Sequence, residues 1–171
     1  MTDASALVLG VDPGTARTGF GLVEHRADGG LRLVSYGVIE TEAGEPMGER
    51  LLRLETELLE LLTRHAPASA GVEKLYFDRN VSTAMTVGQA RGVVLVSLAR
   101  RSIPVQEYTP GEVKQAVAGY GGADKRQMQS MVRLLLGMDH EPRPDDAADA
   151  LAIAICHAHA SRTRQRIQEA G

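Results

Sequence analysis

Residues 7–15 read LVLGVDPGT, and this segment says more about the fold than any other in the chain. Its first five residues form an apolar run typical of a buried β-strand, and the run ends at Asp12. Pro13 and Gly14 then end the strand, because glycine lets the backbone turn tightly and lets a phosphate approach it. An acid at the end of a buried strand, just before such a turn, is a candidate functional carboxylate.

The rest of the chain continues as a mixed α/β domain. Apolar runs bounded by Gly or Pro predict strands, and apolar spacing of 3.6 residues predicts helices. The expected strands are 7–12, 18–24, 31–40, 68–73 and 103–108, and the expected helices are 51–62, 81–101, 110–118, 124–136 and about 145–159. The order βββαβαβααα corresponds to a single α/β domain over residues 1–171 that opens with an antiparallel meander. We expect residues 162–171 to form a flexible basic tail.

Composition excludes several classes of protein. Apolar residues make up 43% of the chain and charged residues 24%, a globular balance that argues against disorder. No uninterrupted apolar run has membrane-spanning length, and the first residues do not resemble a signal peptide. The single cysteine, Cys156, excludes an intrachain disulfide framework and is expected to be a small buried helix residue. We therefore expect a cytoplasmic protein.

The formal net charge of −3 does not by itself indicate a nucleic-acid-binding protein. If four of the acids are metal ligands, the remaining charge becomes +1, and DNA affinity depends on local basic surface rather than on the total. The local basic groups are Arg100, Arg101, Lys114, Lys125, Arg126 and the C-terminal Arg162, Arg164 and Arg166. Each is also readily explained as a solvated surface charge, so charge leaves the partner open.

Four carboxylates stand where a strand or helix would hold them rigidly. Asp12 and Glu73 each end a short apolar run, whereas Asp146 and Asp149 lie three residues apart near the start of an alanine-rich helix. That spacing places the last two on one helix face, with Asp145 expected as the N-cap. Oxygen ligands suit hard cations such as Mg²⁺, and two such ions about 4 Å apart are a recurring device for phosphodiester cleavage. The prediction depends on whether the four carboxylates converge.

Two further motifs indicate contacts. Tyr76 and Phe77 follow Glu73 closely, and we expect Tyr76 to be exposed and able to stack on an unpaired base while Phe77 packs in the core. Gly88 and Gly92 are four residues apart in a predicted helix, where glycine is unfavourable. Such a pair leaves a flat stripe for another helix, within the chain or across a dimer.

Together these motifs resemble those of the RuvC family of bacterial Holliday-junction resolvases, from Leu7 to about His159. Four ordered segments carry the resemblance: GVDPGT at 10–15, VE at 72–73, GQARGV at 88–93 and DAADALA at 146–152. The resemblance implies a ribonuclease H-like fold, in which a central five-stranded mixed sheet carries acids on its first and fourth strands and on the C-terminal helix. The strand order expected from the apolar pattern agrees with this.

The resemblance also implies an activity and its residues. Family members are homodimers that nick a four-way junction symmetrically, leaving 5′-phosphate and 3′-hydroxyl ends, with RuvA and RuvB as branch-migration partners. Asp12, Glu73, Asp146 and Asp149 match the family's catalytic, metal-binding acids, which implies two Mg²⁺ per subunit, with Mn²⁺ as a substitute.

Other positions match family residues that contact DNA or the second subunit. Lys114 and Lys125 match lysines implicated in DNA binding, and Arg126 beside Lys125 is expected to join them. Tyr76 matches an aromatic residue that acts near the junction centre. The helix that carries Gly88 and Gly92 is expected at or near the dimer interface.

Three other functions compete with this one. The Asp-x-Gly-Thr turn at Asp12 also occurs in actin-type ATPases, but those need two such domains and an adenosine-binding motif, for which 171 residues leave no room. A ribonuclease H-like nuclease acting on structured RNA is a closer alternative. A junction-binding module without activity is the third, although clustered acids repel DNA unless metal is bound.

Overall fold

The computed structural model describes residues 6–74 and 80–171. Its elements in chain order are β1 (Leu7–Asp12), β2 (Arg17–His25), β3 (Leu31–Glu40), α1 (Met47–His65), β4 (Ser69–Glu73), α2 (Val81–Arg100), β5 (Val105–Tyr108), α3 (Pro110–Ala118), α4 (Lys125–Leu136) and α5 (Asp145–Ala170). The predicted order of strands and helices is confirmed, with boundaries shifted by a few residues at most elements. The main exception is the last helix.

The strands form one five-stranded mixed sheet in the order β3-β2-β1-β4-β5. β1, β2 and β3 are antiparallel neighbours, which confirms the opening meander. β4 pairs with β1, and β5 with β4, in parallel. Parallel neighbours require crossover connections, and α1 and α2 supply them. β1 therefore lies at the centre of the sheet, where both of its faces are covered.

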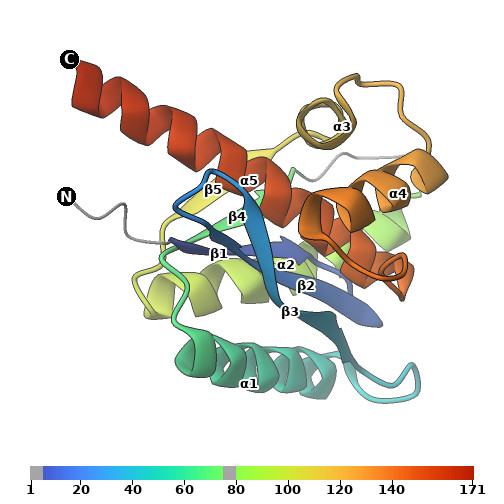
Figure 1. The fold of residues 1–171 in the computed structure, drawn as a ribbon. Coiled ribbons are helices and arrows are strands. Elements are labelled where there is room, and N and C mark those ends of the chain that lie inside the picture. The colour runs from blue at the N-terminus through green and yellow to red at the C-terminus, as the bar shows by residue number, and fades with distance from the viewer. Residues whose placement is uncertain (1–5, 75–79) are drawn as a thin grey trace.

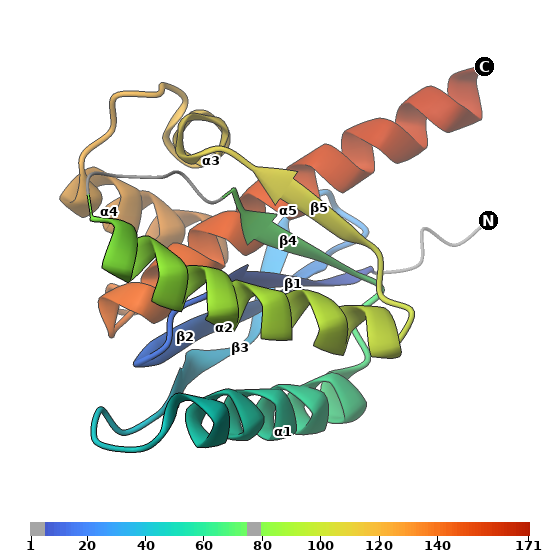
Figure 2. The ribbon, with the colours of Figure 1, turned by 180° about the vertical axis from the view of Figure 1, so that it is seen from behind.

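Helices cover both faces of the sheet (Figures 1 and 2). One face packs against α1 and α2 through a core that includes Leu9, Val11 and Val72. The other face packs against α5, with α3 and α4 beside it, through a core that includes Val8 and Ile153. Because successive side chains of a strand point to opposite faces, the α5 face receives Asp12 from β1.

Glycines in the sheet let α5 lie unusually close to it. A β carbon on Gly10 would stand 2.2 Å from the carbonyl oxygen of Ala150, and one on Gly19 would stand 2.0 Å from the carbonyl oxygen of Asp146. A β carbon on Gly21 would meet the Leu151 side chain at 2.7 Å. The alanine-rich first half of α5 is the complementary surface, since small residues allow the helix backbone to contact the strands directly. Cys156 on the same helix is buried, as expected.

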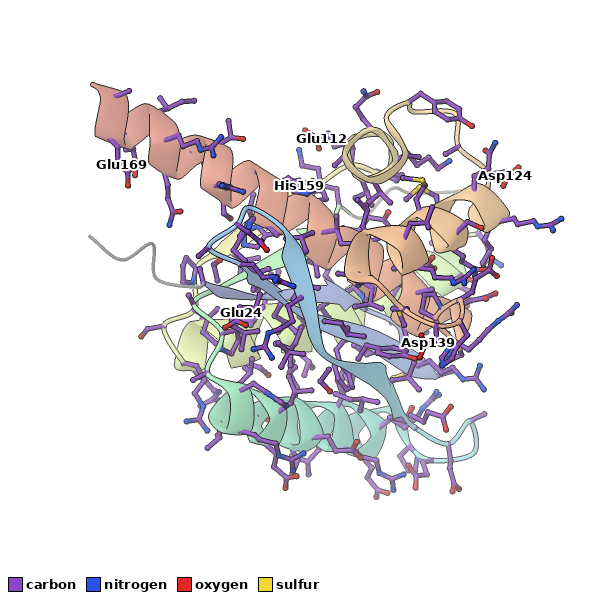
Figure 3. All side chains as sticks on the ribbon, in the orientation of Figure 1. Glu24, Glu112, Asp124, Asp139, His159 and Glu169 are labelled. Atoms are coloured by element: carbon purple, nitrogen blue, oxygen red, sulfur yellow. The ribbon has the colours of Figure 1, made fainter. Side chains whose placement is uncertain are left out.

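Two expectations about α5 are wrong. Asp145 is not the N-cap: Pro144 is, without a side-chain hydrogen bond, and Asp145 is the first helical residue. The helix also does not end near His159 but continues to Ala170, projecting beyond the sheet, with Glu169 near its tip (Figures 1 and 3). Arg162 explains part of the extension, because its Nη1 donates to the Gly29 carbonyl oxygen at 3.0 Å. The flexibility of this segment stays a prediction.

Helix α2 is the most apolar long helix that the described residues contain, although polar residues interrupt its apolar run. By length and composition alone it is apolar enough to cross a membrane, and within the described residues it is the one helix that meets this test. A helix of a globular protein can meet the same test. Its apolar surface is divided, with Ala90, Val94 and Leu98 buried against the core and Val81, Met85 and Val96 exposed.

Candidate active site

Asp12 and Glu73 lie side by side at the carboxyl ends of two neighbouring strands. Each ends its strand, and the residues just before them, Val11 and Val72, are paired in the parallel β1–β4 ladder. Ala70 and Val72 belong to the core beneath α1 and α2, so strand alternation turns Glu73, like Asp12, toward α5. The carboxyl ends of two adjacent parallel strands thus bring two acids together that are far apart in sequence.

The first turns of α5 bring the other two acids to the same place. The close contact between Gly19 and the Asp146 carbonyl fixes the start of α5 next to the end of β1, since Gly19 pairs with Asp12. Ala147 and Ala148 are buried, which holds this turn of the helix against the sheet. Asp146 and Asp149 therefore lie close enough to Asp12 for their charges to raise its pKa, and the convergence of all four acids on one metal site stays a prediction.

The pKa values of the acids reflect this crowding. The pKa of Asp12 is raised to about 7, first by burial and then by the negative charges of Asp149, Glu73 and Asp146, in that order of importance. Desolvation also raises the pKa of Glu73 and of Asp149, although Asp149 stays accessible to solvent. The ionised form of Asp12 is thus disfavoured by the other three acids, and that of Glu73 by Asp149. A cation placed among them would relieve that repulsion.

The donor set suits a hard divalent cation. All four groups are carboxylates, and Mg²⁺ and Mn²⁺ prefer oxygen ligands. Within residues 6–74 and 80–171, no three acidic, histidine or cysteine side chains are drawn together into a ready-made coordination group. The residues fit a magnesium site by their chemistry and by their positions at the ends of β1 and β4 and at the start of α5.

The turn after Asp12 is held from both sides. Thr18 Oγ1 donates to the Gly14 carbonyl oxygen at 2.8 Å, and a β carbon on Gly14 would stand 2.4 Å from the Arg17 carbonyl oxygen. Thr15 Oγ1 donates to the Thr86 carbonyl oxygen at 2.8 Å, which ties the turn to α2. Gly14 is thus required for the tightness of the turn, and the turn fixes the end of β1 that carries Asp12.

Two predicted DNA-contacting lysines border the acids. Lys114 from α3 and Lys125 from the start of α4 line a pocket of about 300 Å³ together with Glu73 and Asp149, which we call the Lys114 pocket. The floor of this pocket is apolar and includes Val113, Met128, Val132, Ala152 and Ile153. The positive charge of Lys114 offsets part of the rise in the pKa of Glu73, and that of Lys125 offsets part of the rise in the pKa values of Asp12 and Asp149. Both lysines therefore stand within electrostatic reach of the acids.

A second hollow contains residues that the sequence did not single out. It is an open depression of about 680 Å³ lined by Arg17, Lys125, Arg143, Pro144, Asp145 and Asp146, which we call the Asp146 depression. Lys125 lines both hollows. Arg17 and Arg143 were missed because neither belongs to a basic cluster in the sequence. The available signal was that each lies within five residues of a predicted metal ligand, Asp12 or Asp146.

The remaining predicted residues are not at the acids. Arg126 is exposed on α4 and does not line the Lys114 pocket or the Asp146 depression. Gly88 and Gly92 are on α2, on the other face of the sheet, and a β carbon on Gly92 would meet nothing within 4 Å. Tyr76 and Phe77 lie outside the described residues. Their predicted roles, in base stacking and in the core, stay predictions.

The sheet order, with acids ending the first and fourth strands and opening the C-terminal helix, defines a ribonuclease H-like fold. Within that class the chain belongs to the RuvC family: the family model described as crossover junction endodeoxyribonuclease RuvC matches residues 8–157. Both the fold and the family expected from the sequence motifs are confirmed.

Individual relatives support the assignment to the RuvC family. The crossover junction endodeoxyribonuclease RuvC of Chloroflexus aggregans is 63% identical over 159 residues, covering 92% of this chain and 96% of the relative. A structure of Thermus thermophilus RuvC in complex with a Holliday junction substrate is 41% identical, covers 92% of this chain and 96% of that one, and superimposes with a TM-score of 0.88. The yeast mitochondrial Holliday junction resolvase Ydc2 is 15% identical with a TM-score of 0.64, which shows the shared fold alone.

Proposed function

We propose that the chain is a structure-specific endonuclease that resolves Holliday junctions in recombination and repair. In this proposal it makes paired, divalent-metal-dependent nicks that leave 5′-phosphate and 3′-hydroxyl ends. The observation that carries the proposal is the meeting of Asp12, Glu73, Asp146 and Asp149 beside Lys114 and Lys125. Membership of the RuvC family, with a relative solved on a junction substrate, supports junction DNA over other nucleic acids.

The roles of the acids follow from their places. Asp12 is central, since all three other acids act on its pKa, and it would be a ligand shared by two ions, one with Glu73 and one with Asp146 or Asp149. Two Mg²⁺ ions bound there, or Mn²⁺ in their place, would supply an activated water and stabilisation of the leaving 3′-oxygen. Asp12 and Glu73 are suited to holding the ions in fixed positions because they end rigid strands of the central sheet.

The lysines would position the DNA strand. Lys114 and Lys125 border the acids from α3 and α4, so they would neutralise phosphates next to the cleaved bond, with Arg126 as a further contact on α4. A phosphate contact of this kind fixes the register of the strand without reading its sequence. Tyr76 would stack on an unpaired base near the junction centre.

A homodimer would provide the two sites that symmetric nicking needs. Val81, Met85 and Val96 form an exposed apolar stripe on α2, with Gly92 open between the last two. A stripe of this kind on the outer side of a helix suits burial against a twofold copy, which would match the approximate twofold symmetry of a junction. We extend the proposal to delivery of the junction by RuvA and RuvB and to a cytoplasmic location.

The test uses a labelled synthetic four-way junction and a linear duplex of matching sequence, with Mg²⁺, Mn²⁺ or EDTA. We expect paired, religatable nicks in the junction alone, lost in EDTA and in Asp12→Asn. A library of junctions with varied core sequences ensures that a sequence requirement does not hide cleavage. Preferential cleavage of structured RNA would identify the chain as an RNA nuclease instead. Tight junction binding with no nicks across the library would identify a binding module.

A further inference from the structure

The Asp146 depression gathers three basic side chains from three separate segments. Arg17 begins β2, Lys125 begins α4, and Arg143 precedes α5. Their side chains are 53%, 57% and 71% exposed. Cations that converge on one hollow from different segments raise the local positive potential more than scattered surface charges do. Asp146, one of the four acids of the candidate active site, also lines this hollow.

Each of these cations is already paired with an acid. Arg17 Nε lies 3.0 Å from Glu40 Oε1, and Lys125 Nζ lies 2.7 Å from Asp145 Oδ2. Arg143 Nη1 lies 3.8 Å from Asp145 Oδ1, which also accepts a hydrogen bond from Gln129 Nε2 at 2.9 Å. Asp145 is therefore held by three groups and faces two of the three cations. Exposed pairs of this kind contribute little to stability, so an incoming anion can replace the carboxylate readily.

The geometry of DNA links this depression to the acids. A DNA strand carries one phosphate about every 3.4 Å of helix axis. When one phosphate lies on Asp12 and Asp146, the next phosphates along the strand come within reach of side chains as long as arginine and lysine that border Asp146.

We propose, on the basis of the junction cleavage proposed above, that the Asp146 depression binds a backbone phosphate of the cleaved strand next to the scissile phosphate. Arg17, Lys125 and Arg143 contact that phosphate. Asp145 forms ion pairs with Lys125 and Arg143 in the DNA-free protein and competes with the phosphate for them. Asp145 thereby weakens binding of any DNA that places a phosphate in the depression, the junction included.

The first experiment removes two of the cations. Junction affinity is measured from low to physiological salt in an Asp12→Asn background, so that the DNA stays intact. We expect Arg17→Gln with Arg143→Gln to reduce the magnitude of the slope of log affinity against log salt by up to about 1 and the affinity by up to about fivefold per cation. The matched control is Arg53→Gln with Arg100→Gln, two exposed, glutamate-paired arginines on α1 and α2. A slope and affinity equal to the control would overturn the phosphate site.

The second experiment removes the competing charge. Asp145→Asn is expected to tighten junction binding several-fold, because the phosphate no longer competes with a carboxylate for Lys125 and Arg143. That gain should shrink when Arg143→Gln is also present, because the freed cation is then missing. Unchanged or weaker binding by Asp145→Asn would overturn the role of Asp145. Circular dichroism and thermal unfolding confirm that each variant is folded.

The two proposals fail in different ways. Wild-type protein that neither binds nor cuts any junction in the library overturns the proposed resolvase, and the phosphate site with it. Wild-type protein that cuts junctions, while the Arg17 and Arg143 variants bind like the control, overturns the phosphate site alone.

Discussion

A β carbon on Gly19 would stand 2.0 Å from the carbonyl oxygen of Asp146, so β2 and the start of α5 touch backbone to backbone. Gly19 pairs with Asp12 in the β1–β2 ladder. A single residue without a side chain therefore sets how closely the acids of α5 approach the acid of β1. This contact links the packing of the domain directly to the geometry of the candidate active site.

Gly19→Ala tests that link. The added methyl group would collide with the backbone of α5, so the helix must shift. We expect a loss of about 1–3 kcal/mol in the free energy of unfolding. Junction cleavage should fall by more than tenfold, because Asp146 and Asp149 move with the helix. Gly44→Ala is the control, since a β carbon there meets nothing within 4 Å. Wild-type cleavage by Gly19→Ala would show that the contact does not position the acids.

Magnesium should stabilise the protein in the absence of DNA. Binding at 100 times the dissociation constant adds about 2.7 kcal/mol, which corresponds to a rise in Tm of roughly 5–10 °C for a domain of this size. Asp12→Asn should remove most of this rise. In EDTA the same variant should be more stable than wild type, because one of four mutually repelling carboxylates is gone. Calorimetry with and without Mg²⁺ measures both effects.

Asp139→Asn serves as the control for charge removal, since Asp139 is exposed in the loop between α4 and α5 (Figure 3). It should keep the magnesium-dependent rise. A magnesium-dependent rise in the Tm of Asp12→Asn equal to that of wild type would show that the ion binds elsewhere.

His157 should make the fold sensitive to mild acid. It is buried, with Nε2 2.7 Å from Ser69 Oγ and Nδ1 2.8 Å from the Tyr108 hydroxyl. Arg164 donates to that hydroxyl at 3.5 Å, which leaves the hydroxyl proton for Nδ1 and Nε2–H for Ser69. Burial, followed by the charges of Arg164 and His25, lowers the pKa of His157 to about 4. Protonation would force Nδ1 to compete with Arg164 for the same oxygen.

The direction of the pH effect follows from that lowered pKa. Between pH 6.5 and 4 the unfolded chain binds a proton at His157 that the folded chain does not, so stability falls as pH falls through this window. We expect this residue to account for about 2–3 kcal/mol between pH 7 and 4.5. Urea unfolding should show a flatter profile for His157→Gln than for wild type. Exposed His140→Gln should keep the wild-type slope, and parallel profiles for all three proteins would rule out this role.

Charges on the outer side of α2 should separate the subunits. Met85→Glu with Val96→Glu would bury two unpaired charges in the proposed interface, and we expect the dimer to weaken by at least about 100-fold. Gly92→Leu should weaken it too, by holding the helices apart. Leu52→Glu with Leu134→Glu changes two equally exposed apolar residues on α1 and α4 and should leave the dimer intact. Sedimentation measures the assembly state, and a persistent dimer in the α2 variants would place the interface elsewhere.

Lys114→Ala should weaken junction binding evenly across sequences. Loss of one phosphate contact lowers the slope of log affinity against log salt by about 1. Arg100→Ala, an exposed arginine at the end of α2, is the matched control. Affinity that is unchanged from low to physiological salt would remove Lys114 from the DNA interface.

The sequence by itself determined the local structure and the identity of the acids. Apolar alternation predicted the strands, and β1 ends at Asp12 as the pattern indicated, because a strand that is buried on both faces needs an unbroken apolar run. The helix predicted over residues 110–118 is likewise observed as α3, and the structure adds that Thr109 caps it in a capping box with Glu112. Such features depend on neighbours in sequence, and so they can be read along the chain.

Only the tertiary structure decided what depends on contacts across the chain. Arg17 and Arg143 meet Lys125 in one depression because a strand, a helix and a loop happen to end there. The last helix runs on to Ala170, and Arg162 within the extension donates to the Gly29 carbonyl oxygen, a contact with no local signal. Asp145 is the first residue of that helix rather than its N-cap, and its carboxylate binds Lys125 and Gln129 from α4 instead. Long-range partners override local preference wherever they offer a stronger bond than the nearest residues do.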